Sequence, residues 1–150
     1  MTGSIAASGN VNTLLKADGS INNLKEKNYC FINLFYNCES LTQAPELPAT
    51  TLAAYCYASM FSGCISLTQA PELPATTLAD DCYRHMFRFC YKLNNINVNF
   101  SEWYISDSIS NETYMWLEDV ASTGTFTCPT TLSEKRGVSF IPEGWTVIRK

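Results

Sequence analysis

Apolar and polar positions recur together every 26 residues along the first two thirds of the chain. The segment SLTQAPELPATTLA occurs twice, at 40–53 and 66–79. The pattern C-Y-x-x-M-F-x-x-C follows it at 56–64 and 82–90, and a half-copy, C-F-x-x-L-F-x-x-C, stands at 30–38. A period in the twenties predicts successive coils that stack and bury a shared core.

Each copy predicts a short strand followed by a short helix. Prolines within the identical segment, such as Pro45 and Pro48, disfavour a helix there and keep the strand short. The apolar residues of the second half, at 56, 57, 60, 61 and 64, would share one face of a helix. We therefore expect an α/β repeat solenoid of leucine-rich-repeat type, with 26-residue repeats, short parallel strands, short helices and an α+β C-terminal cap.

The two ends of the chain depart from the period. We expect residues 1–28 to form a partial N-terminal coil or cap, residues 29–93 to form the leucine-rich-repeat coils, with units near 29–38, 39–64 and 65–90, and residues 94–150 to form the C-terminal cap. Within that cap, alternation at 96–100 predicts a strand, and Asn111 is a candidate N-cap for a helix reaching Val120. Two further short strands are expected at 125–127 and 145–148.

Composition and charge exclude some classes of protein. The net charge is −4 over 150 residues, and no run of Lys and Arg is present, so we expect no nucleic-acid partner. No apolar run approaches the length of about 18 residues that a bilayer-spanning helix needs, so no transmembrane segment is expected. The first ten residues lack the basic and apolar regions of a secretory signal.

Six of the seven cysteines occupy equivalent positions in the copies. They are Cys30, Cys38, Cys56, Cys64, Cys82 and Cys90. Disulfides or a metal site are one interpretation, but a spacing of eight residues resembles no usual zinc motif. We therefore predict that they form a structural core ladder of small apolar side chains. The state of Cys128 stays open.

Catalytic and metal chemistry find little support in the residues. No nucleophile elbow, phosphate loop or H-E-x-x-H motif is present, so no catalytic residue is proposed and the chain is expected not to be an enzyme. His85 is the only histidine, and with Asp81 it would supply only half of a metal site. We expect no cofactor and no bound metal.

The copies differ mainly at positions that the predicted helices would turn outward. This outer face is the candidate binding surface, and its residues are Tyr55, Ser59, Arg84, His85, Arg88 and Phe89. Mixed arginine and aromatic residues are typical of binding surfaces. The alternative is a solvated face on which residues vary freely.

The repeated motif resembles the BspA-like leucine-rich repeats of surface proteins of Bacteroidetes and of their bacteriophages. The segments VASTGTF at 120–126 and IPEGWTV at 141–147 resemble the ends of such proteins. The resemblance implies a curved solenoid on a cell or virion surface, and roles in adhesion to proteins and glycans. If Met1 is native, a virion protein made in a host cytoplasm fits better than a bacterial adhesin, because the chain starts without an export signal.

Two functions follow as hypotheses. In the first, the chain is a non-catalytic, surface-exposed recognition module that binds a cell-surface protein or glycan, as an adhesin or as a phage protein that contacts the host. In the second, it is a structural spacer or assembly module of a virion or envelope protein, with no ligand of its own. Either could form a homo-oligomer or belong to a larger surface assembly.

Overall fold

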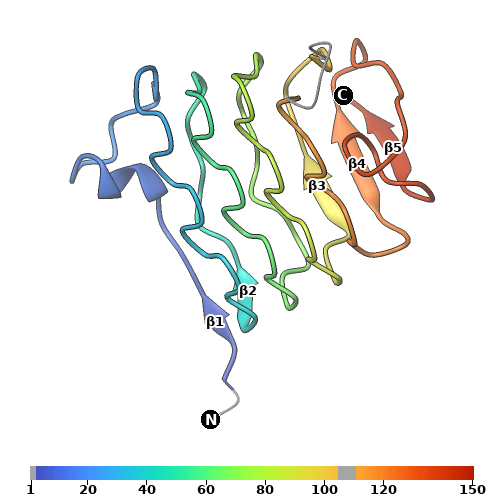
Figure 1. The fold of residues 1–150 in the computed structure, drawn as a ribbon, viewed down its shortest axis with the longest axis horizontal. Helices are drawn as coiled ribbons and strands as arrows, with labels where there is room; N and C mark the ends of the chain where they lie inside the picture. Colours follow the sequence, from blue (N-terminus) through green and yellow to red (C-terminus); the bar gives the residue numbers. More distant parts are fainter. Residues whose placement is uncertain (1–2, 105–110) are drawn as a thin grey trace.

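The computed structural model describes residues 3–104 and 111–150, which form mainly turns and irregular backbone. The regular elements are β1 (Ile5–Ala6), the 3-10 helix η1 (Val11–Leu14), β2 (Leu41–Gln43), β3 (Asn95–Asn97), β4 (Thr125–Cys128) and β5 (Thr146–Arg149). Strand β1 pairs with β2 in parallel, and β3, β4 and β5 form a parallel sheet in that order. Figure 1 shows the first sheet near the N-terminus and the second near the C-terminus.

The prediction of an α/β leucine-rich-repeat solenoid is therefore wrong. No α-helix occurs among the described residues, and the strands make only one two-stranded and one three-stranded sheet. Within the two full copies of the motif, only Leu41–Gln43 forms a strand. The chain is a small domain that consists mostly of coil and turns. The helix expected from Asn111 to Val120 is also absent, since 112–119 consists of turns.

Consecutive turns replace the expected helices. We call the four stretches 28–37, 54–63, 80–89 and 112–119 the turn segments. In the second of them, the amides of Cys56, Ala58 and Met60 donate to carbonyls three residues earlier. The amides of Tyr55, Tyr57 and Ser59 lie between these and instead donate to the third turn segment, at 2.8–3.0 Å. An α-helix would need all these amides for its own i−4 bonds, so alternate donation excludes it.

A left-handed residue recurs every fourth position in the turn segments. In the second segment φ is +55° at Tyr55, +53° at Ser59 and +78° at Gly63, and the third segment repeats this at Asp81, His85 and Phe89. A left-handed residue in each group of four reverses the backbone before a helix can propagate. The apolar spacing of 56, 57, 60, 61 and 64 repeats every four residues, which suits such turns as well as it suits a helix face.

The three short strands predicted in the C-terminal part are confirmed by β3, β4 and β5. Strand β3 covers the first half of the alternating stretch, and its Ile96 pairs in register with Phe126 of β4. Phe126 in turn pairs with Val147 of β5. Alternate burial along β4, with Phe126 and Cys128 inside, matches a strand that covers a core on one face.

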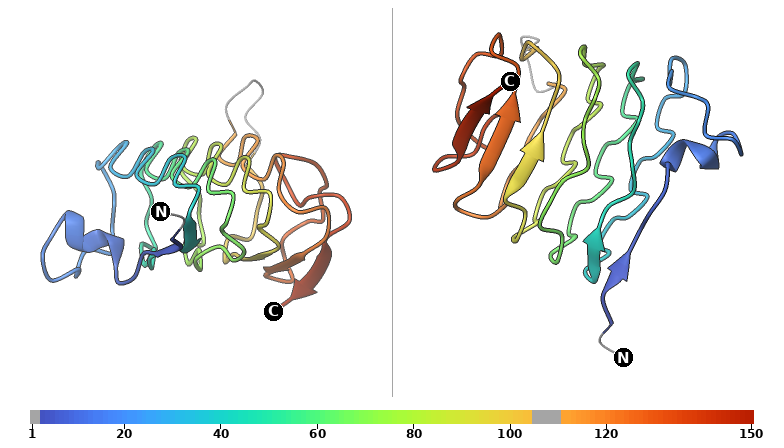
Figure 2. Two further views of the ribbon diagram at one scale, coloured as in Figure 1. Left: turned by 90° about the horizontal axis from the view of Figure 1, so that it is seen from below. Right: turned by 180° about the vertical axis from the view of Figure 1, so that it is seen from behind.

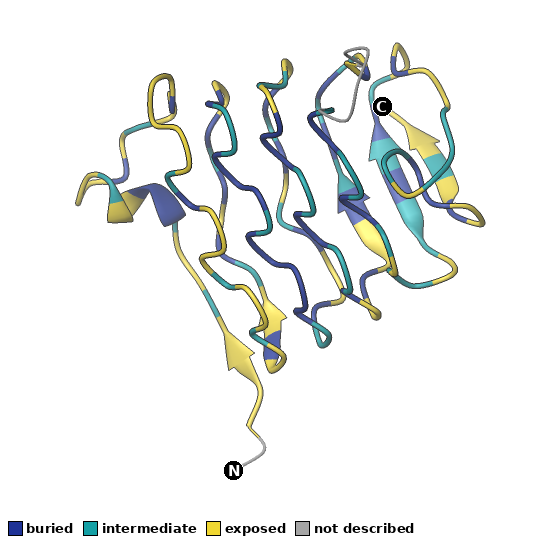
Figure 3. Ribbon diagram, in the orientation of Figure 1, coloured by how far each residue is buried: buried dark blue, intermediate teal, exposed yellow. Residues whose placement is uncertain are grey.

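The core runs as a continuous layer beneath the turn segments. Equivalent aromatic side chains stack face to face in two rows, Phe31–Tyr57–Tyr83–Trp116 and Phe35–Phe61–Phe87, with ring centroids 5.5–6.2 Å apart. Figure 3 shows that buried residues are concentrated in the middle coils and in β3 and β4, whereas the coil nearest the N-terminus is mostly exposed. Trp103 and Trp145 complete the core at the C-terminal end, with exposed fractions of 8% and 2%.

The two ends of the row of turn segments differ. At the C-terminal end, residues 133–141 cover the fourth turn segment, and the Leu117 amide donates to the Val138 carbonyl at 3.2 Å. At the N-terminal end, the first turn segment has no such cover, as the side views in Figure 2 show. Its carbonyls at Cys30, Ile32, Leu34 and Tyr36 accept no backbone hydrogen bond from the described residues.

Candidate functional site

The six candidate binding residues lie on the outer side of the second and third turn segments. Tyr55 and Ser59 belong to the second, and Arg84, His85, Arg88 and Phe89 belong to the third. All six are partly exposed. Because Ser59 donates its amide to the Arg84 carbonyl at 2.8 Å, the two segments hold these residues side by side. The fold thus brings together all six.

Both candidate arginines make ion pairs within the chain. Arg84 Nη1 lies 3.2 Å from the Asp81 carboxylate, which is only 2% exposed, and Arg88 pairs with Glu118 of the fourth turn segment. Each guanidinium also covers a ring: Arg84 lies 4.5 Å from the centre of Tyr114, and Arg88 lies 4.4 Å from that of Phe89. Such contacts fix the arginines flat on the surface.

Aromatic rings extend this surface to both sides. Tyr55 stacks on Tyr29 at 4.9 Å, and a hydrogen bond to the Asp81 carboxylate raises the pKa of Tyr55. Phe89 contacts Tyr91, and His85 contacts Tyr114. We call this set of rings and guanidinium groups the aromatic–arginine face: Tyr29, Tyr55, Arg84, His85, Arg88, Phe89, Tyr91 and Tyr114.

Three members of this face escaped the sequence analysis. Tyr29 belongs to the half-copy, which was aligned only from Cys30 onward. Tyr114 lies in a turn segment that lacks the cysteines, because Glu112 and Val120 stand at the equivalent positions. The step from the third to the fourth segment is 30 residues, since the Tyr83 amide donates to the Glu112 carbonyl at 2.8 Å. A search that allowed four extra residues would have found the pattern E-T-x-x-W-L-x-x-V.

The structure brings no set of three metal-binding side chains together around His85 among the described residues. Its possible co-ligand Asp81 already pairs with Arg84. Burial, together with Arg84 and Arg88, lowers the pKa of His85, and its Nε2 atom is buried with no hydrogen-bond partner. Among the described residues, no three His, Cys, Asp or Glu side chains gather closely enough to hold a metal ion.

The six ladder cysteines lie along the core as free thiols. Cys56, Cys64, Cys82 and Cys90 are buried, whereas Cys30 in the first turn segment and Cys38 directly after it are partly exposed. Two thiols join neighbouring segments, since Cys64 Sγ donates to the Phe35 carbonyl at 3.2 Å and Cys90 Sγ to that of Phe61 at 3.1 Å. Burial raises the pKa of Cys56 and of Cys64 to about 12.

These positions predict a graded thiol reactivity. A thiol reacts as its thiolate, and burial suppresses both ionisation and access. In the native protein at pH 8, we expect iodoacetamide to modify Cys30 and Cys38 within minutes and the four buried thiols at least about a hundredfold more slowly. Peptide mapping by mass spectrometry measures each rate. Equal rates for Cys38 and Cys64 would contradict the ladder.

Glu112 takes the place of a ladder cysteine in the fourth turn segment and is only 4% exposed. Its Oε2 atom has no partner, and burial, with smaller effects of Asp80 and Asp81, raises the pKa of this carboxyl. A carboxyl whose pKa is raised on folding stabilises the protein below the pKa of the unfolded chain. That stabilisation is lost as the pH rises through the folded-state pKa.

Replacing Glu112 by glutamine is therefore expected to stabilise the protein at pH 7. The gain in free energy of unfolding should be on the order of 1 kcal/mol and should vanish at about pH 3, where the acid is neutral in both states. Urea unfolding at both pH values measures it. The exposed Glu143→Gln is the matched control and should change little. A loss of stability at pH 7 would show that the carboxylate is needed.

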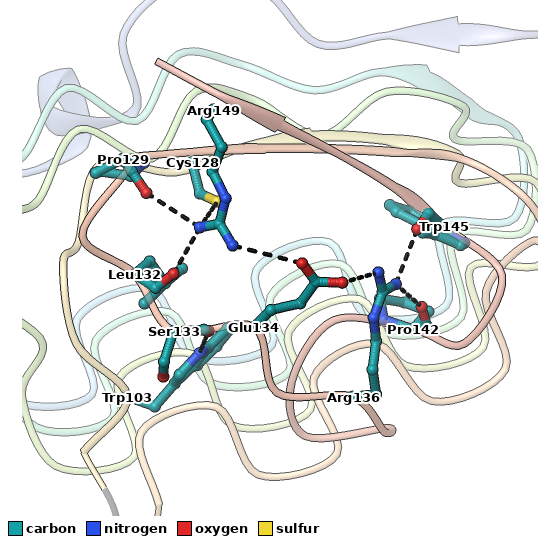
Figure 4. A network of polar contacts seen from close by, with 10 residues as sticks. All are labelled: Trp103, Cys128, Pro129, Leu132, Ser133, Glu134, Arg136, Pro142, Trp145 and Arg149. Carbon is teal, nitrogen blue, oxygen red and sulfur yellow. Dashed lines mark hydrogen bonds and ion pairs between the residues drawn. The ribbon is translucent and has the colours of Figure 1, made fainter.

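A second polar cluster lies between the C-terminal loop and the last sheet (Figure 4). Glu134 pairs with both Arg136 and Arg149. Arg136 donates to the carbonyls of Pro142 and Trp145 at 3.1 and 2.8 Å, and Arg149 donates to the Pro129 carbonyl at 3.2 Å. Because these donors satisfy carbonyls of the loop, the cluster fixes the loop's course. The nearby Cys128 thiol has its pKa raised by burial.

Comparison with known proteins gives no relative for this chain: no family model, curated protein or solved structure matches it. The leucine-rich-repeat assignment is overturned by the backbone. The cell-surface, phage and Bacteroides associations that came with that assignment find no support in the comparisons. No helix within the described residues is long and apolar enough to cross a bilayer.

Proposed function

We propose that the chain is a non-catalytic recognition module that binds a cell-surface protein or glycan through the aromatic–arginine face. The observation that supports this most is the clustering of partly exposed tyrosine, phenylalanine, histidine and arginine side chains from four turn segments. Aromatic and arginine residues dominate the binding energy of protein interfaces. Aromatic rings also stack on the apolar faces of other molecules.

Preorganisation strengthens the proposal. Ring contacts and ion pairs already hold Arg84 and Arg88, so little side-chain entropy is lost when a partner binds. The backbone beneath them is tied across segments by hydrogen bonds of 2.8–3.0 Å, for example from His85 to the Tyr114 carbonyl and from Phe89 to that of Glu118. A rigid face of this kind suits binding to a partner whose surface is complementary in shape.

The test is binding of the fluorescently labelled chain to immobilised glycans and extracellular-matrix proteins, beside an Arg88→Ala/Phe89→Ala variant. Arg84 is kept because its removal would leave the buried Asp81 carboxylate unpaired. We expect saturable binding that weakens at least about tenfold in the variant, with unchanged melting. The control Lys25→Ala/Lys27→Ala removes two exposed charges elsewhere and should bind normally. Binding that survives the first variant, or no binding at all, overturns the proposal.

A second candidate function, an assembly module, is favoured by the uncovered first turn segment. Tyr29, Ile32, Leu34 and Tyr36 are 40–53% exposed there, beside carbonyls without backbone partners. Exposed apolar edges are common sites of association. Light scattering of the same purified chain distinguishes the two functions: a concentration-dependent oligomer that Leu34→Asp dissolves supports assembly, and a monomer at all concentrations contradicts it.

A further inference from the structure

The two identical proline-containing stretches of the chain do not join each other. We call residues 41–52 and 67–78 the proline segments. They precede turn segments that are joined by five backbone hydrogen bonds, from the amides of Tyr55, Tyr57, Ser59, Phe61 and Gly63. No backbone hydrogen bond connects the proline segments themselves, although every residue of both is described.

Each proline segment forms its backbone hydrogen bonds on the side that faces away from the other proline segment. Residues 41–46 pair with the N-terminal stretch, where the Val11 amide donates to the Glu46 carbonyl at 3.1 Å. In the other segment, the amides of Ala70 and Leu73 donate to the carbonyls of Asn95 and Asn97 at 3.0 and 3.1 Å. The seam between the two segments is thus the one place where two proline-containing stretches would have to pair.

Proline limits the number of hydrogen bonds that could form across this seam. Pro45 and Pro48 on one side, and Pro71 and Pro74 on the other, have no amide hydrogen to donate. The stretches at 3–11 and 94–99 contain no proline, and they do pair. The amides of Ala44 and Leu47, which are equivalent to the donating amides of Ala70 and Leu73, have no partner among the described residues.

Two adjoining hollows occupy the seam. One, of about 450 Å³, is lined by Ala44, Pro45, Glu46, Leu47, Pro48, Pro71, Glu72 and Pro74. The other, of about 420 Å³, shares Ala44, Pro71 and Glu72 and is lined further by the threonine and glutamine side chains at 42, 43, 68 and 69. Together they form what we call the proline groove, with a size in the range of ligand-binding pockets.

The charges of the groove have no counterpart among the described residues. Glu46 and Glu72 are exposed at equivalent positions of the two walls, and neither forms an ion pair with a described residue. Proline rings flank both carboxylates. A lysine or arginine side chain matches this arrangement, because its methylene groups pack on apolar rings while its charged end meets the carboxylates.

The comparison of the two copies points to the same place. Between the proline segments all exposed side chains are identical. This holds in the groove, at Thr42/Thr68, Gln43/Gln69 and Glu46/Glu72, and outside it, at Thr50/Thr76 and Thr51/Thr77, whereas the outer positions of the turn segments differ. Burial explains why core residues are kept, but it places no restriction on exposed ones. The two walls of the groove therefore present the same threonine, glutamine and glutamate side chains, as a site with two equivalent halves would.

We propose that the proline groove binds an extended, basic peptide segment of a partner protein. Lysine or arginine side chains of the segment lie between Glu46 and Glu72. Its backbone carbonyls accept hydrogen bonds from the free amides of Ala44 and Leu47. This site is separate from the aromatic–arginine face, and it does not depend on the function proposed for that face.

The test uses nuclear magnetic resonance with an acetylated hexapeptide of alternating arginine and valine as the probe. Titration into the ¹⁵N-labelled chain should shift the amide signals of Ala44, Leu47 and Glu72, with weaker binding at higher salt. A hexapeptide of alternating glutamate and valine should cause no shifts. Absence of shifts at about 1 mM basic peptide, or shifts confined to other residues, overturns the proposal.

Isosteric variants identify the carboxylates. Glu46→Gln/Glu72→Gln keeps the shape of the groove and should weaken binding of the arginine–valine peptide at least about tenfold. The matched control, Glu39→Gln/Glu143→Gln, removes the same charge from exposed positions outside the groove and should bind as the parent does. If both double variants lose the same affinity for the peptide, the peptide responds only to the net charge of the protein. That result would overturn the proposed site. Arg88→Ala/Phe89→Ala leaves groove binding unchanged, so failure of either proposal is recognised separately.

Discussion

Replacing Phe61 by alanine is expected to lower the free energy of unfolding by about 4 kcal/mol. Phe61 is fully buried, and its ring stacks between Phe35 and Phe87 at 5.5 Å on each side. Truncation removes both stacking contacts and leaves a cavity in the middle of the row. The backbone hydrogen bond from Phe61 to the Met86 carbonyl resists collapse of the segment into that cavity.

Urea unfolding followed by tryptophan fluorescence measures this loss, and Phe35→Ala is the matched control. Phe35 belongs to the same row but is only partly buried, and it stacks on a single ring. Its truncation should cost roughly half as much, because one neighbour and part of the burial are missing. If the two variants lose equal stability, the row does not derive its stability from central stacking.

The sequence pattern predicted which side chains are buried better than it predicted the backbone conformation. Residues 26 apart, such as Phe61 and Phe87 or Tyr57 and Tyr83, do stack on one another. Most side chains assigned to the shared apolar face are buried, because an apolar residue is buried whichever local backbone carries it. The strand at 96–100 was predictable for a related reason: period-two alternation has few competing interpretations.

The missing helices have a specific physical cause. Turns that repeat every four residues and an α-helix place the residues at i, i+1, i+4 and i+5 on one side, so periodicity cannot separate them. The decisive residues are the left-handed ones, and several are Tyr or Phe, which seldom adopt positive φ. Tyr29, Tyr55 and Phe89 donate their amides to the next segment, and such long-range bonds are not visible in a single copy of the motif.

The sequence identified which residues lie in the candidate site, but it did not identify the contacts that they make. Position within the copies grouped Tyr55, Ser59, Arg84 and Phe89 on one side, and the structure places them on neighbouring segments. The ion pairs of Arg84 and Arg88 with Asp81 and Glu118 depend on the turn geometry. The proline groove escaped notice because it arises where two pairing interactions fail, and the identical segments had been assigned to paired strands.

Replacing Gly124 by alanine is expected to lower the free energy of unfolding by about 2–3 kcal/mol. A methyl group there would lie 2.5 Å from the Asn94 carbonyl oxygen and 2.7 Å from the Trp145 ring. Neither neighbour moves freely. The Asn94 carbonyl accepts the Thr125 amide at 2.8 Å, and the Trp145 side chain donates to the Ala121 carbonyl at 2.7 Å. The β3–β4–β5 sheet would have to shift at its first residue pair to admit the methyl group.

Gly3→Ala is the matched control for this change. A methyl group at Gly3 meets nothing within 4 Å, and its φ does not lie in the left-handed region, so stability should change by less than about 0.5 kcal/mol. Both variants are compared by thermal and urea unfolding, and the Trp145 fluorescence should report the disturbance only in Gly124→Ala. If Gly124→Ala is as stable as the parent, the end of the sheet admits the methyl group with no loss in the free energy of unfolding. The close approach of Asn94 and Trp145 would then contribute nothing to the packing of the C-terminal core.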